Sequence, residues 1–310
     1  MPYLPRALVA ANLAVFYRIA LHARMPVTVA RKLLDAGSAL QLLPSGTVVR
    51  PLTLAGRRAE LVTVGATERN RAVLYLHGGG FTLGSLATHR SLAAHLSRES
   101  GAAVYVLDYR RAPEDPHPAA LDDATEAYLE LLSEHGYDPD RVAVAGDSAG
   151  GGLSLATARA LVDRHGVRPA ALGLIAPWVN PGARDAPRER DLVVNAAWSV
   201  AASTAYLGDG SVTDPGYAPL LGDLAGLPPT MVHVGTTELL HPQAVELVEK
   251  LRAAGVRVEF TEYRDLWHVA HLQASVLREA DEAVRELGGF LRSELERSAL
   301  ESSALESSTG

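Results

Sequence analysis

The sequence lacks cysteine altogether, and this absence removes two classes of site. Without thiols the chain can form neither disulfide bonds nor thiolate metal centres, although this says little about its cellular compartment. Eleven histidines are present, but none has the paired helical spacing of a zinc site, so we expect no metal. Excess basic charge is also missing, and the formal net charge of -7 argues against a nucleic-acid partner.

A long hydrophobic run is missing as well. The N-terminal apolar run Ala7–Tyr17 is interrupted by Asn12, closed by Arg18, and too short to span a membrane. Only Arg6 could supply the positive region of a signal peptide, and no clear Ala-x-Ala cleavage site follows it. We therefore expect an amphipathic helix rather than a signal peptide, no stable membrane anchor, and a cytoplasmic location by default.

The sequence does contain a regular alternation of patterns on an ordinary globular composition. Hydrophobic residues make up 47% and charged residues 21%, which is enough to bury a core. The runs predicted as strands are Arg58–Val64, Ala72–Leu76, Ala103–Leu107, Arg141–Ala145, Ala171–Ile175, Thr230–Val234 and Arg257–Tyr263. The segments with helical periodicity are Thr88–Ser97, Ala119–His135, Ala149–His165, Pro242–Ala254 and Ala270–Leu295. This alternation predicts an α/β fold with a mostly parallel sheet covered by helices on both faces.

Three segments fall outside this alternation. Residues 1–47 read as helical with no strand, and residues 185–210 form a helical insertion between two sheet strands. We expect both to fold over one edge of the sheet as a cap, with residues 48–297 forming the main domain. The tail, residues 298–310, is a low-complexity repeat of Ser, Ala, Leu and Glu, and we assign it no function.

A glycine-flanked serine is the strongest chemical signal. Ser148 is the third residue of the pentapeptide 146–150, Gly-Asp-Ser-Ala-Gly, which joins a predicted strand to a predicted helix. The glycines let strand and helix approach closely, so that the serine oxygen is exposed at a helix N-terminus, where the helix dipole favours negative charge. The glycines that follow lack the Lys-Ser/Thr of a phosphate-binding loop, and the α/β context excludes a trypsin-like protease. Ser148 is therefore the predicted nucleophile.

A second glycine-rich loop, residues 77–81 with the sequence His-Gly-Gly-Gly-Phe, directly follows another predicted strand. Glycines at this place leave backbone N–H groups free to approach a substrate oxygen, which is the requirement for an oxyanion hole. The predicted oxyanion donors are the backbone N–H groups of Gly78, Gly79, Gly80 and Ala149. We assign structural support of this region, rather than catalysis, to His77 and Asp147.

A serine is not nucleophilic at neutral pH without a positioned base, and one histidine lies where that base is expected. His268 follows the last predicted strand and precedes the last helix, and Glu238 follows the strand before it. The order Ser148, Glu238, His268 is the serine–acid–histidine order of this kind of sheet. Asp265 and Glu262 compete for the acid role. Asp265 would have to fold back along its own loop to reach the imidazole. Glu262 lies inside a predicted strand, where the pleat fixes the direction of its side chain. Glu238 is therefore the predicted acid.

These motifs resemble the hormone-sensitive-lipase-like branch of the α/β-hydrolase esterases. The resemblance covers Ala72 to about Arg292 and rests on three segments: 77–81, 146–151, and 108–120, which reads Asp-Tyr-Arg-Arg-Ala-Pro-Glu-Asp-Pro-His-Pro-Ala-Ala. It implies an α/β-hydrolase fold, with a mostly parallel eight-stranded sheet and a helical cap built from the N-terminal segment and an insertion before the acid. It also implies a serine carboxylesterase that hydrolyses small-molecule esters of short to medium acyl chains through an acyl-enzyme, without a cofactor. Many members dimerise, so the resemblance includes a homodimer among the expected assemblies.

The chain departs from the family pattern at two places. In the segment 108–120, the apolar, histidine and aromatic residues usual in the family are replaced by Arg111, Asp115 and His117. These changes affect the expected packing of the segment and not the chemistry. Glu238 stands where many members have an aspartate followed by proline, although some branches use glutamate. The same fold and triad serve amidases and peptidases, and the fold also hosts non-catalytic receptors, so both remain alternatives to an esterase. The presence of His268 argues against a receptor, which would be expected to lose the base.

Overall fold

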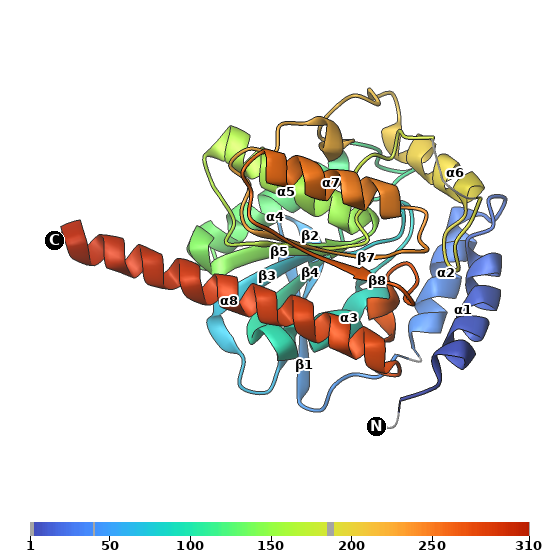
Figure 1. Cartoon of the computed structure of the whole chain (residues 1–310), viewed down its shortest axis with the longest axis horizontal. Helices are drawn as coiled ribbons and strands as arrows, with labels where there is room; N and C mark the ends of the chain where they lie inside the picture. Colours follow the sequence, from blue (N-terminus) through green and yellow to red (C-terminus); the bar gives the residue numbers. More distant parts are fainter. Residues whose placement is uncertain (1–2, 40, 185–188, 310) are drawn as a thin grey trace.

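The computed structural model describes residues 3–39, 41–184 and 189–309, which contain one eight-stranded sheet (Figure 1). Its strands are β1 (Thr47–Leu54), β2 (Arg57–Val64), β3 (Glu68–Leu76), β4 (Ala102–Leu107), β5 (Val142–Asp147), β6 (Leu172–Ile175), β7 (Thr230–Gly235) and β8 (Val258–Tyr263). They lie in the order β1-β2-β4-β3-β5-β6-β7-β8. β2 is antiparallel to both of its neighbours, and all other neighbouring pairs are parallel. The predicted mostly parallel sheet is confirmed.

Helices cover both faces of this sheet. The helices α3 (Leu86–Ser100) and α8 (Arg278–Thr309) pack on one face, and α4 (Ala119–Ser133), α5 (Ala149–His165) and α7 (His241–Ala253) pack on the other. Alternate residues of each strand face opposite sides, so Val104 and Val106 of β4 join the cluster under α3 and α8, while Tyr105 and Leu107 join the other. Every residue of β4 and β5 is buried, as expected for strands covered on both faces. The predicted α/β layering is confirmed.

Two local features of the sequence-based prediction differ from the structure. β1 was not predicted, because it is an edge strand in which exposed residues such as Arg50 and Pro51 break the apolar pattern. The predicted helix Ala270–Leu295 is divided into a 3₁₀ turn, Ala270–Gln273, and α8. Val269 takes a left-handed conformation with φ of 52°, which starts this short turn and carries the chain away from the loop that contains His268.

Three further helices gather at one side of the sheet, where α1 (Arg6–Ala20), α2 (Val27–Ser38) and α6 (Ala196–Leu207) lie together (Figure 1). α6 occupies the second half of the predicted insertion, and residues 185–188 of that insertion lie outside the described residues. Arg31 of α2 fastens this group to the main domain by donating hydrogen bonds to the carbonyl oxygens of Thr82 (2.8 Å) and Ala112 (2.9 Å). In the part of the chain that the structure describes, no helix is both long and apolar enough to cross a membrane.

Candidate active site

The predicted nucleophile lies on a strained turn between β5 and α5. Ser148 has φ of 53° and ψ of −120°, a region that a residue with a side chain rarely adopts. Two glycines make the turn possible by their lack of a Cβ. A Cβ on Gly146 would collide with the carbonyl group of Gly150, and one on Gly150 would collide with the carbonyl oxygen of Leu76. The turn places the serine oxygen at the start of α5, at the carboxyl end of the parallel strands.

Three predicted residues from distant parts of the chain meet at this turn. The Ser148 hydroxyl donates to Nε2 of His268 over 2.9 Å, and Nδ1–H of His268 donates to Oε2 of Glu238 over 2.6 Å. All three side chains are buried. Glu238 contacts the imidazole nitrogen that faces away from Ser148, so it favours the tautomer whose Nε2 is free to accept the serine proton. The arrangement can activate an oxygen nucleophile.

The charges around the imidazole make His268 a stronger base. Burial acts to lower the pKa of His268, but the charge and hydrogen bond of Glu238 outweigh it, and Asp191 and Asp147 act in the same direction. The net result is a pKa raised above the usual 6.5. The imidazolium that forms when His268 takes a proton is therefore stabilised by the site.

The two rival carboxylates have other partners. Asp265 pairs with Arg6, with 3.2 Å between Oδ2 and Nη1, and its side chain is 57% exposed. Glu262 accepts a hydrogen bond from Nε2 of His241 over 2.6 Å. The carboxylate in contact with His268 is the one chosen from the sequence.

The glycine loop after β3 faces Ser148, but it supplies fewer free donors than predicted. Gly79 (φ 120°) and Gly80 (φ 60°) adopt conformations that favour glycine. Among the described residues, the N–H groups of Gly79, Gly80 and Ala149 have no partner in the protein. The N–H of Gly78 instead donates to Oδ1 of Asp147 over 3.0 Å. Its assignment as an oxyanion donor was therefore wrong, because its proton is already engaged.

A buried network holds this glycine loop in place. His77 stacks on Tyr109 with ring centroids 4.3 Å apart, and its Nδ1–H donates to the Gly78 carbonyl oxygen over 2.8 Å. Burial, with a smaller effect from His89, lowers the pKa of His77 to about 3, so its ring is neutral. Asp147 accepts the Gly78 N–H and lies 3.2 Å from Nε2 of His89. Both residues that we assigned to structural support thus contact the loop, whereas nothing in the sequence marked His89.

A second carboxylate, which the sequence-based analysis missed, holds the acid loop. Asp191 accepts backbone hydrogen bonds from Leu239 (3.0 Å), Val193 (2.8 Å) and Val194 (2.7 Å). Leu239 directly follows Glu238, so Asp191 ties the predicted insertion to the loop that carries the acid. No sequence pattern identifies it, because the contact joins residues 48 positions apart.

Replacing Asp191 by Asn tests whether its charge acts on His268. The amide can keep its oxygen with the N–H groups of Val193 and Val194, but it removes a negative charge and turns its NH₂ group toward the N–H of Leu239. The imidazolium should therefore lose stabilisation and the pKa of His268 should fall. We expect the acid limb of the pH profile of kcat/KM to move to lower pH by about half a unit, with kcat reduced a few-fold. An acid limb that stays in place while the protein folds normally would show that Asp191 acts on the loop alone.

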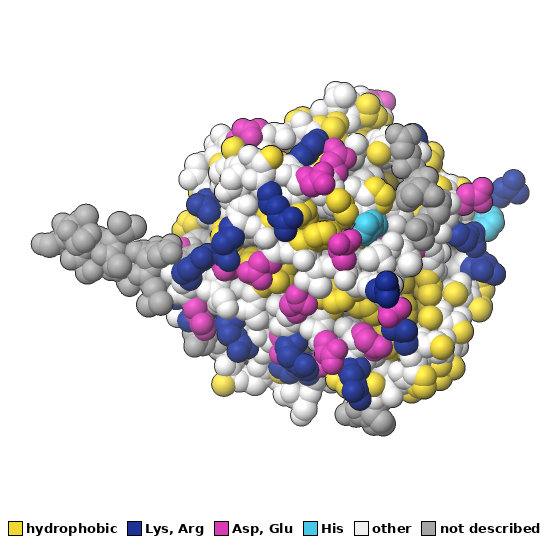
Figure 2. Space-filling view, in the orientation of Figure 1, with side chains coloured by type: hydrophobic (Ala, Val, Ile, Leu, Met, Phe, Trp, Pro, Cys, Tyr) yellow, Lys and Arg dark blue, Asp and Glu magenta, His cyan; other side chains and the backbone are white. Residues whose placement is uncertain are grey.

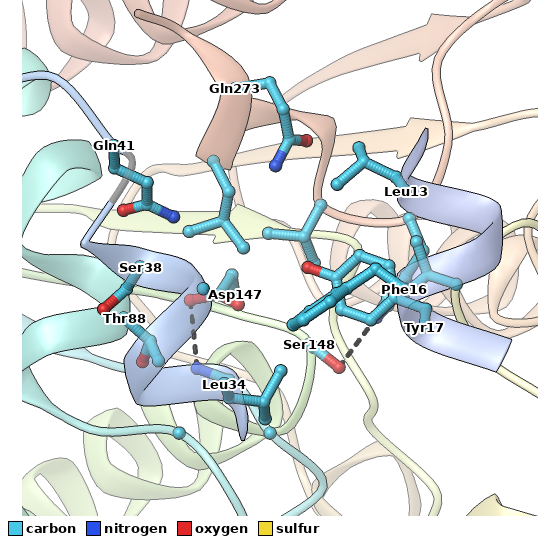
Figure 3. A pocket seen from close by; sticks show the side chains of 18 of the residues that line it. Leu13, Phe16, Tyr17, Leu34, Ser38, Gln41, Thr88, Asp147, Ser148 and Gln273 are labelled. Carbon is cyan, nitrogen blue, oxygen red and sulfur yellow. Dashed lines mark hydrogen bonds between the residues drawn. The ribbon is translucent and has the colours of Figure 1, made fainter. Parts of the chain in front are cut away.

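Ser148, His268 and the glycine loop line a pocket of about 470 Å³. Its apolar walls come mainly from the two N-terminal helices and include Leu8, Leu13, Phe16, Tyr17 and Leu34. Figure 3 shows Phe16 and Tyr17 of α1 directed toward Ser148. Trp198 of α6 packs so closely against the glycine loop that a Cβ on Gly80 would lie 2.5 Å from its ring. All three helices at this side therefore contribute to the walls.

Comparison with known proteins agrees with this geometry. Residues 73–272 match the model of a family with the α/β hydrolase fold. An acetyl-hydrolase from Streptomyces hygroscopicus is 41% identical over 255 residues, which cover 81% of this chain and 84% of the relative. An ethyl acetate hydrolase from Pseudomonas putida is 32% identical over 225 residues, which cover 69% of this chain and 70% of the relative. The crystal structure of an esterase from the bacterial hormone-sensitive lipase family has a TM-score of 0.88 at 34% identity and covers 95% of this chain and 100% of that one.

The chain therefore belongs to the α/β-hydrolase family, in its hormone-sensitive-lipase-like branch. The prediction of an ester hydrolase, made from three short motifs, is confirmed at the level of the enzyme class.

Proposed function

We propose that the protein is a carboxylesterase that hydrolyses esters of short to medium acyl chains through a Ser148–His268–Glu238 triad. The observation that carries this proposal is the continuous pair of hydrogen bonds, 2.9 Å and 2.6 Å long, which joins the oxygen of Ser148 through His268 to the carboxylate of Glu238. Ser148 and His268 line an apolar pocket. Apolar walls with a few convergent polar groups suit a small uncharged ester.

The reaction proceeds in two acyl transfers. Ser148 Oγ attacks the ester carbonyl carbon while His268 Nε2 takes its proton, and the carbonyl oxygen becomes an oxyanion. The N–H groups of Gly79, Gly80 and Ala149 are the donors that can hold this oxyanion. The C–O bond to the alcohol then breaks and His268 returns the proton to the departing oxygen. A water molecule, deprotonated by His268, attacks the acyl-enzyme and releases the acid with Ser148 restored.

The walls of the pocket support the preference for shorter chains. Every methylene buried against the aliphatic and aromatic side chains of α1 and α2 gains about 0.8 kcal/mol, so longer chains bind better until the pocket is full. Beyond that length a chain must displace Phe16, Leu34 or Trp198, which costs packing. We therefore also propose that α1, α2 and α6 act as the cap that limits the substrate.

A profile of hydrolysis rates tests this proposal. We expect kcat/KM on p-nitrophenyl esters to rise from acetate, pass through a maximum at short to medium chains, and fall beyond roughly eight to ten carbons, because further methylenes find no room. Measurement needs a matched series from acetate to palmitate at concentrations where every ester is monomeric. Faster cleavage of palmitate than of butyrate would contradict the chain-length proposal.

The same measurement separates the esterase from an amidase or peptidase. Each ester is paired with the amide of the same acyl group, and the rate acceleration over the uncatalysed reaction is compared within each pair. The esterase proposal expects a larger acceleration for the ester than for the amide in every pair. Comparable acceleration of both bonds would favour the amidase alternative.

A further inference from the structure

An apolar stripe runs along the outer surface of α1. Leu8, Val15 and Ile19 expose 51%, 64% and 55% of their surface, and Leu4, just before the helix, exposes 46%. Positions 8, 15 and 19 fall on one side of α1, because residues four and seven apart in a helix face the same way, and Leu4 lies just before the end of the helix that carries Leu8. In Figure 2 hydrophobic side chains gather over the part of the surface where Figure 1 places α1. The stripe is unusual because large apolar residues rarely form contiguous exposed surfaces without a partner.

Unpaired cations lie on α1, in the turn that follows it and on α2. Arg18, Arg24 and Lys32 are exposed, and none of them has an ion-pair partner among the described residues. The segment 1–47 contains five Lys or Arg and one Asp, although the whole chain has a net charge of -7. That single acid, Asp35, is occupied as the acceptor of the Ser85 hydroxyl over 2.6 Å. The N-terminal helices are therefore a basic, apolar region on an otherwise acidic protein.

The carboxylates nearest to the start of α1 do not reverse this charge. Asp265 and Glu279 both lie beside Arg6, with its Nη1 3.2 Å and 3.6 Å from their oxygens. With Arg6 they leave one net negative charge at this end of the stripe, away from Arg18 and Arg24. Because residues 1–47 carry five Lys or Arg and one Asp, the region stays positive when Asp265 and Glu279 are counted with it.

The stripe also borders the entrance to the active site. Leu4 and Leu8 are half exposed to solvent and at the same time line the pocket that holds Ser148. A surface that covers the stripe will therefore lie directly against the mouth of the pocket. A substrate held in that surface can then reach Ser148 without crossing water.

We propose that this surface, the stripe Leu4, Leu8, Val15 and Ile19 together with the cations Arg18, Arg24 and Lys32, docks reversibly on an anionic phospholipid surface. α1 then lies in the plane of the lipid headgroups with its apolar residues inserted and the cations on the phosphates. Charge selects this occupant over a second copy of the chain, because stripe-to-stripe pairing would bring two basic regions together. The docked orientation directs the pocket toward esters dissolved in the lipid.

The test uses the full chain and vesicles of two compositions, one of phosphatidylcholine alone and one of equal parts phosphatidylglycerol and phosphatidylcholine. We expect co-sedimentation with the anionic vesicles and little with the neutral ones, and we expect high salt to weaken it because counterions screen the cations. The double variant Val15→Glu/Ile19→Glu should weaken the association at least tenfold, since it removes two inserted apolar side chains and adds two charges. Arg18→Gln/Lys32→Gln should weaken it on anionic vesicles alone.

A matched control comes from the other exposed apolar residues. Val212 and Leu221 are each 46% exposed and lie away from α1, so Val212→Glu/Leu221→Glu makes the same chemical change elsewhere and should leave vesicle binding unaltered. None of the residues changed lines the pocket, so every variant should keep wild-type kcat/KM on a soluble short-chain ester. This last measurement separates a failure of docking from a failure of the esterase proposal.

Three results would overturn the proposal. One is a wild-type protein that does not bind anionic vesicles at low salt. Another is vesicle binding that survives the Val15→Glu/Ile19→Glu change. The third is a dimer in solution that dissociates on the same change, which would assign the stripe to contact between copies of the chain.

Discussion

Ser148→Ala is expected to lower kcat on a short-chain ester by about 10⁶, which leaves only the acceleration due to binding and the oxyanion donors. The methyl group cannot attack a carbonyl carbon, and His268 loses the proton that it is placed to accept. The fold should survive, because alanine has the same Cβ as serine and adds no strain at the positive φ of 53°. The measurement is kcat on a short-chain ester for the purified wild type and the purified variant, together with a thermal unfolding curve for each protein.

Ser154→Ala is the matched control for this change. Ser154 lies on α5, the helix that Ser148 precedes, and is also buried, but its hydroxyl donates to the Gly150 carbonyl oxygen over 2.7 Å. Its loss should change kcat only a few-fold. A folded Ser148→Ala protein that keeps a tenth of the wild-type rate would remove Ser148 from the nucleophile role.

The turn that carries Ser148 could be predicted from the sequence because its signal is local. Gly146 is required by the close approach of β5 and α5, and Gly150 by the close approach of α5 and the end of β3, so the spacing itself encodes the turn. The strands on either side are continuous apolar runs, which is how strands buried on both faces appear in a sequence. The left-handed glycines Gly101 and Gly166 that end α3 and α5 are local signals of the same kind.

Residues whose role depends on distant contacts could not be predicted in this way. Asp191 acts on a loop 48 residues away, and His89 meets Asp147 across 58 positions, with no spacing rule to link either pair. The assignment of Gly78 failed for the same reason. A run of three glycines looks uniform in the sequence, but the carboxylate of Asp147 takes the N–H of the first and leaves those of the other two free.

Among the members of the proposed triad, Glu238 is the one for which the sequence offered competitors, and its replacement by Gln has the second largest expected effect. Each carboxylate oxygen of Glu238 faces one N–H donor: Oε1 accepts from the backbone of Gly235 over 2.6 Å, and Oε2 accepts from Nδ1 of His268 over 2.6 Å. An amide has only one oxygen. In Glu238→Gln the NH₂ group must therefore face either the Gly235 N–H, which distorts the loop, or Nδ1, which forces its proton onto Nε2.

If the NH₂ group of the new glutamine side chain faces Nδ1, His268 carries its proton on Nε2 and cannot accept one from Ser148. The neutral amide also fails to stabilise the imidazolium. We expect kcat to fall by about 10²–10⁴. Because the charge of Glu238 raises the pKa of His268, the acid limb of the kcat/KM profile should also move to lower pH in whatever activity remains.

Asp265→Asn is the paired measurement, because it makes the same carboxylate-to-amide change three residues before His268. Asp265 is 57% exposed and pairs with Arg6 rather than with the imidazole, and an exposed ion pair contributes little. Its loss should leave kcat within about twofold of wild type and the acid limb in place. A mild Glu238→Gln beside a crippled Asp265→Asn would transfer the orienting role to Asp265. Equal losses in both would mean that the loop around His268, and not one carboxylate, sets the orientation of the base.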